Sequence, residues 1–381
     1  MKKKIYFIVL AILVIINLFN IPGSVEEANN IDTGDTAWML VSAALVLLMT
    51  PGLAFFYGGM VNKKNIISTM LQSFVALGVV SILWVTVGFS LAFGDSIGGI
   101  IGDPTTYFNF NGVSLSPNPK FSETIPFLLF ALFQLKFAII TPALITGSFA
   151  ERVRFRSYIL FMVFFVLFIY TPLAHMTWHP DGLLRNWDVL DFAGGTVVHM
   201  SAGFAALAGA VYLGKRRKNV HSPSQVPYII LGTALLWFGW FGFNAGSALG
   251  ANLDAVSAFA NTNFASAAAM IAWIFFDMFN KKKMSATGAC IGAVVGLVAI
   301  TPAAGFVTIG QSIFIGFISA VISWYAVQIK NKSGLDDTLD VFPCHGIGGV
   351  SGMILTAVFA KDVGLVYGET TVFTHHMIAL V

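Results

Sequence analysis

The chain has 381 residues, of which 57% are hydrophobic and only 10% are charged. Soluble domains carry about 25% charged residues, so this composition excludes a water-exposed globular surface and indicates a protein that crosses the lipid bilayer several times. The net charge of +3 does not indicate nucleic-acid binding, because the basic residues form short clusters between apolar stretches. Cys290 and Cys344 both lie in apolar segments and give no disulfide framework.

The N-terminal stretch MKKKIYFIVLAILVIINLFN combines three lysines with an apolar run from Ile5 to Phe19. An apolar run of this length behind a basic start favours a signal peptide, whereas a membrane-spanning helix needs about 20 residues. We therefore predict a signal peptide over residues 1–24, with a first membrane helix as the alternative. The membrane domain is predicted over residues 36–381.

Ten apolar segments follow the leader, and each is close to the length of about 20 residues that a membrane-spanning helix needs. They predict an all-α polytopic membrane protein. In chain order the predicted spans are residues 37–57, 66–93, 124–149, 157–178, 193–213, 227–249, 262–279, 285–303, 306–329 and 345–360.

The basic residues between these spans fall almost entirely on one side of the membrane. Fourteen follow the odd-numbered spans, whereas only Lys120, Arg185 and Lys361 follow the even-numbered spans. By the positive-inside rule, the first span runs from the outside inward. We therefore predict a multi-pass protein of the plasma (inner) membrane with its N-terminus outside after signal cleavage. The fourteen are Lys63, Lys64, Arg152, Arg154, Arg156, residues 215–218, residues 281–283, Lys330 and Lys332.

Ten spans divide into two sets of five. Because five is an odd number, the second set starts on the opposite side of the membrane and is inverted relative to the first. We predict a first repeat over about 36–215 and a second over about 226–365. Inverted repeats place binding sites at their interface, near the middle of the membrane. The fifth span carries DFAGGTVVHMSAG and the tenth carries DVFPCHGIGGVSG, so each holds an Asp, then a His, then a glycine-rich helix.

These two segments place His199 and His345 in equivalent positions if the halves are inverted twins, so that the two rings meet at the centre. Ionisable residues near the middle of the membrane are expensive to bury and indicate function. The alternative for each histidine is a buried neutral imidazole bonded to a carbonyl. The alternative for Asp191 is a cap on the amides of the helix that follows it.

A second candidate group lies in GWFGFNAGSALG, residues 239–250, where Trp240, Phe243 and Ser247 occupy one helical face. The alternative is packing, in which the aromatic rings fill a seam between helices and Ser247 bonds back to its own helix.

Three further aromatic residues belong with this group. Phe133 and Phe137 are one helical turn apart in FQLKFAIITPALITGSF, and Trp178 ends a span in AHMTWHPDG. Ring pairs at that spacing usually pack in the core, and a tryptophan at a span end usually anchors at the membrane surface. The alternative for Trp178 is a platform for a cation.

Several function classes find no support. The sequence contains no Walker loop, no TVGYG filter and no GxSxG elbow, and metal binding by His199 and His345 is only weakly indicated, because neither has a second histidine at HxxxH spacing. We therefore predict a protein that is not an enzyme and uses no cofactor or metal.

The segments DTAWMLVSAALVLLMTPGLAFFYGGMV, FAIITPALITGSFAERVRF, LDFAGGTVVHMSAG, GWFGFNAGSAL and DVFPCHGIGG together resemble the ammonium transporter (Amt/Mep/Rh) family. The resemblance runs from about Asp35 to the last residue. It implies eleven spans in two pseudo-inverted halves, a homotrimer with one pore per subunit, and ammonium or ammonia as substrate with methylammonium as an analogue. It also implies a last span that starts at about 375–381 and is truncated here, and a PII-type signal protein as the cytoplasmic partner of the full-length protein.

The resemblance assigns roles to the candidate residues. The segment WHPDG after Trp178 departs from it, because a glycine-rich run is expected there. Asp191 matches the aspartate behind the recruitment site, with Trp240 as a supporting residue. Phe133, Trp178 and Ser247 match the outer ammonium-recruiting site, Phe137 and Phe243 the stacked phenyl gate, and His199 and His345 the paired pore histidines.

The chemistry agrees with this assignment. Moving a bare ion of ammonium size into a low-dielectric medium costs on the order of 20 kcal/mol before relaxation. Removing a proton from an amine of pKa about 9–10 at pH 7 costs roughly 3–4 kcal/mol. Deprotonation before an apolar pore is therefore favoured over dehydration of the whole ion. An ammonium sensor of the same fold and an Rh-type gas channel remain as alternatives.

Overall fold

The computed structural model describes residues 2–21, 23–24, 30–216 and 223–380. Arg217 and Lys218 of the basic run lie outside these residues, as do Met1 and Pro22 of the predicted leader and Val381 of the predicted last span.

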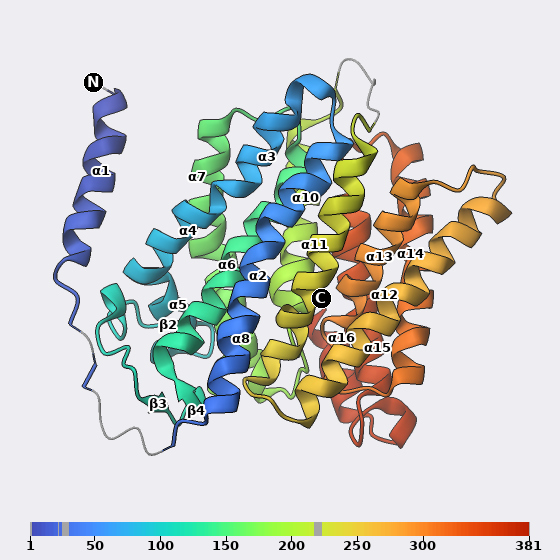
Figure 1. Cartoon of the computed structure of the whole chain (residues 1–381). Coiled ribbons are helices and arrows are strands. Elements are labelled where there is room, and N and C mark those ends of the chain that lie inside the picture. Colours follow the sequence, from blue (N-terminus) through green and yellow to red (C-terminus); the bar gives the residue numbers. More distant parts are fainter. Residues whose placement is uncertain (1, 22, 25–29, 217–222, 381) are drawn as a thin grey trace.

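Long helices that run roughly side by side form the bundle, and α1 (Lys2–Asn17) stands apart at one edge (Figure 1). Within the described residues, nine helical segments are long and apolar enough to cross a membrane, and α13 (Ala286–Ile300) is a shorter apolar helix. Each predicted span overlaps one of these segments. The prediction of an all-α polytopic membrane protein is therefore confirmed.

Several of the spans in the first half consist of consecutive helical pieces, and some of these pieces are single π-helical turns. In chain order the pieces are α2 (Thr33–Met60), η1 (Lys63–Asn65), α3 (Ile66–Phe74), α4 (Ala76–Leu83), η2 (Trp84–Gly88), α5 (Phe89–Phe93), α6 (Phe127–Phe149), α7 (Phe155–Phe165), η4 (Val166–Tyr170), α8 (Thr171–Trp178), α9 (Leu183–Asn186), η5 (Gly195–Met200) and α10 (Ser201–Leu213).

The second half is built from longer uninterrupted helices, apart from its last span. The pieces are α11 (Val226–Ala245), η6 (Gly246–Ala248), α12 (Leu253–Phe279), α13 (Ala286–Ile300), α14 (Ile309–Ser333), η7 (Phe342–Ile347), α15 (Gly348–Phe359), η8 (Leu365–Tyr367) and α16 (Thr371–Ala379).

Helix α12 begins at Leu253, whereas the predicted span begins at residue 262. Polar residues in its first turns lower the local hydropathy, so the apolar pattern places the start of the span too late. The Asn252 side chain caps the helix by accepting from the amide of Ala255 at 3.0 Å. Asn261 is fully buried because its side-chain amide donates to the carbonyls of Ala304 and Val307. The two bonds donated by Asn261 thus help to keep this polar side chain inside the helix, before the apolar run begins.

Two small antiparallel hairpins lie beside α9 at one end of the bundle, which we call the strand end. Strands β1 (Ser96–Ile97) and β2 (Ile101–Gly102) pair with Ser96 opposite Gly102. Strands β3 (Pro117–Asn118) and β4 (Ser122–Pro126) pair with Pro117 opposite Pro126, and the 3-10 turn η3 (Phe108–Phe110) precedes them. The opposite end holds Lys63, Arg152 and Lys215, and we call it the basic end.

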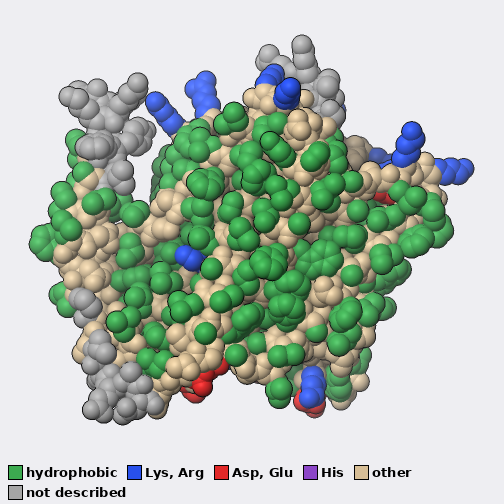
Figure 2. All heavy atoms as spheres, viewed as in Figure 1, with side chains coloured by type: hydrophobic (Ala, Val, Ile, Leu, Met, Phe, Trp, Pro, Cys, Tyr) green, Lys and Arg blue, Asp and Glu red, His purple; other side chains and the backbone are tan. Residues whose placement is uncertain are grey.

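The surface between these two ends is apolar. Figure 2 shows a broad band of hydrophobic side chains across the face in view, with most of the visible lysines and arginines at the basic end. A band of this kind matches the hydrocarbon core of a bilayer. The molecule is therefore oriented with its helices across the membrane.

Close backbone contacts hold the two halves together. A Cβ at Gly203 in α10 would collide with the backbone of Gly346 in η7, and a Cβ at Gly232 in α11 would collide with the backbone of Phe56 in α2. Only glycine permits such approaches, and small residues at helix contacts are typical of membrane bundles. The first of these contacts fixes the separation of the fifth and tenth spans.

Helix α1 packs less tightly than the rest. Ile8 is 53% exposed and Ile12 is 50% exposed. A few polar contacts tie its end to the strand end, including the Asn109 side chain, which donates to the carbonyl of Ile16 at 3.0 Å. The signal-peptide interpretation of this segment stays a prediction.

Candidate functional site

A cavity of about 410 Å³ opens at the strand end, and we call it the mouth pocket. It brings together four of the sequence-predicted residues, Phe137, Trp178, Asp191 and Ser247. Phe133, which the resemblance assigns to the recruitment site together with Trp178 and Ser247, does not line the pocket. It is 1% exposed and its ring lies 5.0 Å from that of Phe137, so it supports the pocket wall from behind.

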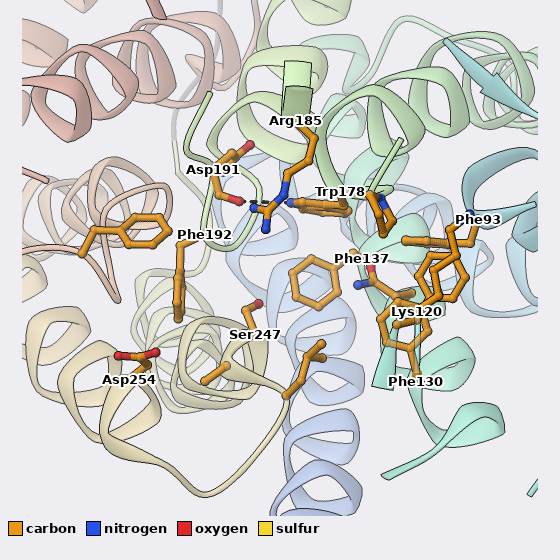
Figure 3. A pocket seen from close by; sticks show the side chains of 16 residues that line it. Phe93, Lys120, Phe130, Phe137, Trp178, Arg185, Asp191, Phe192, Ser247 and Asp254 are labelled. Atoms are coloured by element: carbon orange, nitrogen blue, oxygen red, sulfur yellow. Dashed lines mark hydrogen bonds between the residues drawn. The ribbon is translucent and has the colours of Figure 1, made fainter. Parts of the chain in front are cut away.

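The Trp178 indole is held in place by its neighbours. Its Nε1–H donates to the backbone carbonyl of Asp191 at 3.1 Å, and its ring meets Phe137 edge to face with centroids 5.8 Å apart. Figure 3 shows the indole at the opening with Asp191 beside it. A fixed indole face at the mouth of a cavity is suited to hold a cation.

The Ser247 hydroxyl donates to the carbonyl of Phe243, one turn earlier, at 2.9 Å. This is the bond that the packing alternative predicts. It has a chemical consequence, because a hydroxyl has one hydrogen and two lone pairs. With its hydrogen used, the Ser247 oxygen faces the mouth pocket as an acceptor.

At the inner side of the mouth pocket two phenyl rings pack against each other. Phe137 and Phe243 are 1% and 0% exposed, and their ring centroids lie 4.2 Å apart at an interplanar angle of 31°. Offset rings at this distance are in favourable contact. The pair therefore separates the mouth pocket from what lies beneath it.

Beneath the phenyl pair the structure places the two predicted histidines together. Their Nδ1 atoms are 3.4 Å apart, and the rings are nearly parallel with centroids 5.4 Å apart. His199 is 1% exposed and lies 6.0 Å from Phe243, centroid to centroid. His345 is 3% exposed. The rings thus continue inward from the phenyl pair.

Trp240 supports this arrangement from the side. Its ring stacks on His199 at 5.3 Å, and its Nε1–H donates to the Thr301 hydroxyl at 3.0 Å. His199 Nε2 is buried without a hydrogen-bond partner among the described residues. An unpaired nitrogen in such a place is unfavourable unless a ligand or water meets it.

Asp191 holds the helix that carries His199. Its carboxylate accepts from the amides of Gly194, Gly195, Thr196 and Val197 at 2.6 to 3.4 Å. Burial raises the pKa of Asp191, and these four N–H groups oppose the rise. The cap interpretation therefore describes its contacts, and Gly194 makes the turn possible with a φ of 111°.

In the tenth span, Asp337 makes a contact similar to those of Asp191. Asp337 precedes His345 by the same interval as Asp191 precedes His199, and its carboxylate accepts from the amide of Phe342 at 2.7 Å. Burial and the neighbouring Asp340 raise the pKa of Asp337 to about 6. Asp340 instead forms an ion pair with Lys330 at 2.7 Å.

A charged cluster at the basic end was missed by sequence reasoning. Arg216 pairs with Asp336 at 2.8 Å and with Glu151 at 3.3 Å, and its guanidinium also donates to Thr338. A cavity of about 360 Å³ adjoins this cluster. The acidic run DDTLD before the tenth span was its only signal in the sequence.

The mouth pocket also contains residues that the sequence did not single out, among them Lys120, Arg185 and Asp254. Searching the described residues for three or more His, Cys, Asp or Glu side chains that could hold a metal ion finds none.

A buried series of rings that leads inward from a surface cavity, inside a bundle of membrane-spanning helices, defines a membrane transport protein. The sequence comparisons specify which kind. The model of the Ammonium Transporter Family matches residues 37–381, and the chain belongs to that family. It is accordingly a multi-pass membrane transporter and not an enzyme.

The relatives span most of the chain. It is 48% identical to the ammonium transporter of Aquifex aeolicus (strain VF5) over 363 residues, covering 93% of this chain and 85% of that protein. The crystal structure of Saccharomyces cerevisiae Mep2 is similar with a TM-score of 0.88 at 32% identity, covering 95% of this chain and 87% of the other. The sensor Amt protein is similar with a TM-score of 0.83 at 32% identity, covering 91% and 88%.

Proposed function

We propose that the protein recruits NH₄⁺ at the mouth pocket, removes its proton, and conducts NH₃ through an apolar pore lined by His199 and His345. The observation that carries the proposal is the uninterrupted sequence of rings from Trp178 through the phenyl pair to the histidines. Each step along it suits a different form of the substrate. The cation fits the mouth, and the neutral amine fits the interior.

Recruitment rests on two complementary groups. The Trp178 face attracts a cation by about 0.5–2 kcal/mol, and the Ser247 oxygen accepts an N–H because its own hydrogen is bonded to Phe243. Neither group distinguishes ammonium from potassium strongly by size. Selectivity therefore comes from the next step, since potassium has no proton to lose.

Deprotonation is the cheaper route past the phenyl pair. Dehydrating the whole ion costs on the order of 20 kcal/mol, whereas losing the proton costs roughly 3–4 kcal/mol at pH 7. Beyond the phenyl pair, a neutral imidazole offers one N–H donor and one acceptor. The unpartnered Nε2 of His199 is available to ammonia, and the facing Nδ1 atoms can share a proton.

We further propose that the strand end faces outward and the basic end faces the cytoplasm, in the plasma membrane. The distribution of basic residues supports this orientation. A homotrimer with one pore per subunit and a PII-type partner at the cytoplasmic face are proposals that rest on membership of the family.

The test is transport by the purified protein in proteoliposomes. A jump in ammonium concentration on a solid-supported membrane should evoke a current if the proton crosses as well, and radiolabelled methylammonium uptake should accompany it. Uptake without current would restrict the mechanism to ammonia alone. The absence of both, with the protein folded, would reject transport.

A sensor role is the second candidate, because the chain is also similar to the sensor Amt protein. A sensor that does not transport would bind ammonium at the mouth pocket and show no uptake. Titrating the intrinsic tryptophan fluorescence with ammonium, in wild type and in Trp178→Leu, alongside the uptake measurement separates the two roles, because the difference between the two proteins isolates the signal of Trp178 from that of the other tryptophans.

Replacing Trp178 with Leu should raise the half-saturation concentration for methylammonium uptake several-fold, because a cation–π contact of about 1 kcal/mol is lost. Trp187→Leu is the matched control, since Trp187 is 37% exposed and does not line the mouth pocket. An unchanged half-saturation concentration in the Trp178 variant would exclude the indole from recruitment.

Replacing Phe243 with Ala should let water and larger ions past the phenyl pair, because the ring that covers Phe137 is removed. Potassium current through proteoliposomes should then rise above the wild-type background. Phe241→Ala is the control, because Phe241 lies on the same helix but stacks on Phe259, away from the histidines. Wild-type ion selectivity in the Phe243 variant would show that the phenyl pair is not the barrier.

A further inference from the structure

Arg185 places a permanent positive charge at the opening of the proposed cation site. It lines the mouth pocket together with Trp178 and Ser247, and in Figure 3 its guanidinium extends into the opening between Asp191 and Trp178. Arginine stays charged at any physiological pH. A pocket that attracts cations therefore contains one of its own.

The backbone that carries Arg185 is firmly held. The amide of Leu183 donates to the carbonyl of Gly99 at 2.8 Å, and the amide of Val189 donates to that of Leu184 at 3.0 Å. A Cβ at Gly182 would collide with the carbonyl oxygen of His175, so α9 lies directly on α8. The side chain itself is exposed. The charge is thus fixed near the pocket on a movable arm.

Two carboxylates around the mouth, those of Asp181 and Asp191, are engaged elsewhere. Asp181 pairs with Lys120 at 2.9 Å. Asp191 accepts four backbone N–H groups, as described above. Asp254 also lines the pocket, and Figure 3 shows it away from Arg185, on the side of Ser247. Among the described residues no ion pair includes Arg185.

A guanidinium and an ammonium ion are alternative ligands for the same groups. Guanidinium planes stack on aromatic faces and donate to hydroxyl oxygens, which are the features offered by Trp178 and Ser247. The mouth already contains one contact of this kind, since the Lys120 ammonium lies 5.8 Å from the centre of the Phe121 ring. In Figure 3 the Arg185 guanidinium lies beside the Trp178 indole.

We propose that Arg185 is a specificity-determining residue, a tethered cation that competes with ammonium for the mouth pocket and raises the concentration at which transport saturates. This inference rests on the recruitment step of the proposed function. The tethered guanidinium also narrows the opening of the mouth pocket. It therefore disfavours methylammonium more than ammonium, because the larger cation must displace the guanidinium further.

The test compares Arg185→Gln, Arg185→Lys and wild type in proteoliposomes, by ammonium-evoked current and by methylammonium uptake. Removing a unit charge near the site should lower the half-saturation concentration roughly threefold to tenfold, with the larger fall for methylammonium. Arg185→Lys should stay within about twofold of wild type, because it keeps the charge. Lys361→Gln is the matched control, since Lys361 is exposed, follows the tenth span and does not line the pocket.

The dependence on ionic strength distinguishes an electrostatic effect of Arg185 from a steric one. Raising sodium chloride from 10 to 100 mM shortens the screening length from about 30 to about 10 Å, so the difference between wild type and Arg185→Gln should shrink. A half-saturation concentration that is unchanged or raised in Arg185→Gln overturns the inference. If Trp178→Leu also leaves that concentration unchanged, the recruitment site itself is wrong, whereas a response to Trp178→Leu alone removes only the role of Arg185.

Discussion

Replacing both His199 and His345 with Ala should abolish selective, proton-coupled ammonium transport while the protein still folds. The two rings supply the polar nitrogens beneath the phenyl pair, with Nδ1 atoms 3.4 Å apart. Without the two imidazoles, ammonia has no hydrogen-bonding partner in the proposed pore, and no group there can carry the proton. Each single variant should also lose the relay and leave its partner nitrogen unsatisfied, at about 1–3 kcal/mol.

The decisive measurement is ammonium-evoked current in proteoliposomes, with methylammonium uptake and potassium current recorded alongside. His375→Ala is the control, because His375 lies on α16 and bonds to the carbonyl of Trp187 at 2.7 Å, away from the phenyl pair. Melting temperatures in detergent establish that each variant is folded. Wild-type current and selectivity in the double variant would mean that both histidines only pack.

Replacing Asp191 with Ala should have the largest effect on stability. Its carboxylate satisfies four backbone N–H groups at the start of η5, and it is 7% exposed. Each buried donor left without an acceptor costs about 1–3 kcal/mol, partly recovered by water at the mouth. We expect a loss of about 3–5 kcal/mol in the free energy of unfolding, and a displaced Trp178, whose indole bonds to the Asp191 carbonyl.

Thermal melting in detergent and uptake in proteoliposomes check this prediction together. Asp191→Asn should lie between wild type and Asp191→Ala, because an amide keeps one accepting oxygen. Asp188→Asn is the control, since Asp188 is exposed and its positive φ of 54° is one that Asn tolerates. A wild-type melting temperature for Asp191→Ala would show that water replaces the carboxylate fully.

Regular features of the chain were predictable from sequence. Apolar length located the spans, and the repeated Asp–His–Gly pattern predicted that His199 and His345 would face each other, as the structure has them. Patterns of this kind depend only on neighbouring residues. They predict the folded structure correctly because every membrane span needs an apolar surface and satisfied backbone groups, whatever its tertiary contacts.

Other features depend on contacts between distant segments. The buried Asn261 belongs inside α12 only because the carbonyls of Ala304 and Val307 meet it. The position of Arg185 in the mouth pocket follows from how α9 folds back on α8. Phe133 and Phe137 have the same local spacing pattern, yet only Phe137 lines the pocket. Which aromatic residue faces a cavity is decided by packing partners that a periodic pattern does not contain.

The contact between Gly203 and Gly346 bears on how turnover can occur. Because no side chain separates α10 from η7 there, a rocking motion of one half against the other would have to open a gap between two backbones beside the histidines. Alternating access of the rocking type is therefore disfavoured by the packing. Passage through a rigid conduit, with only the phenyl rings swinging aside, needs no such separation.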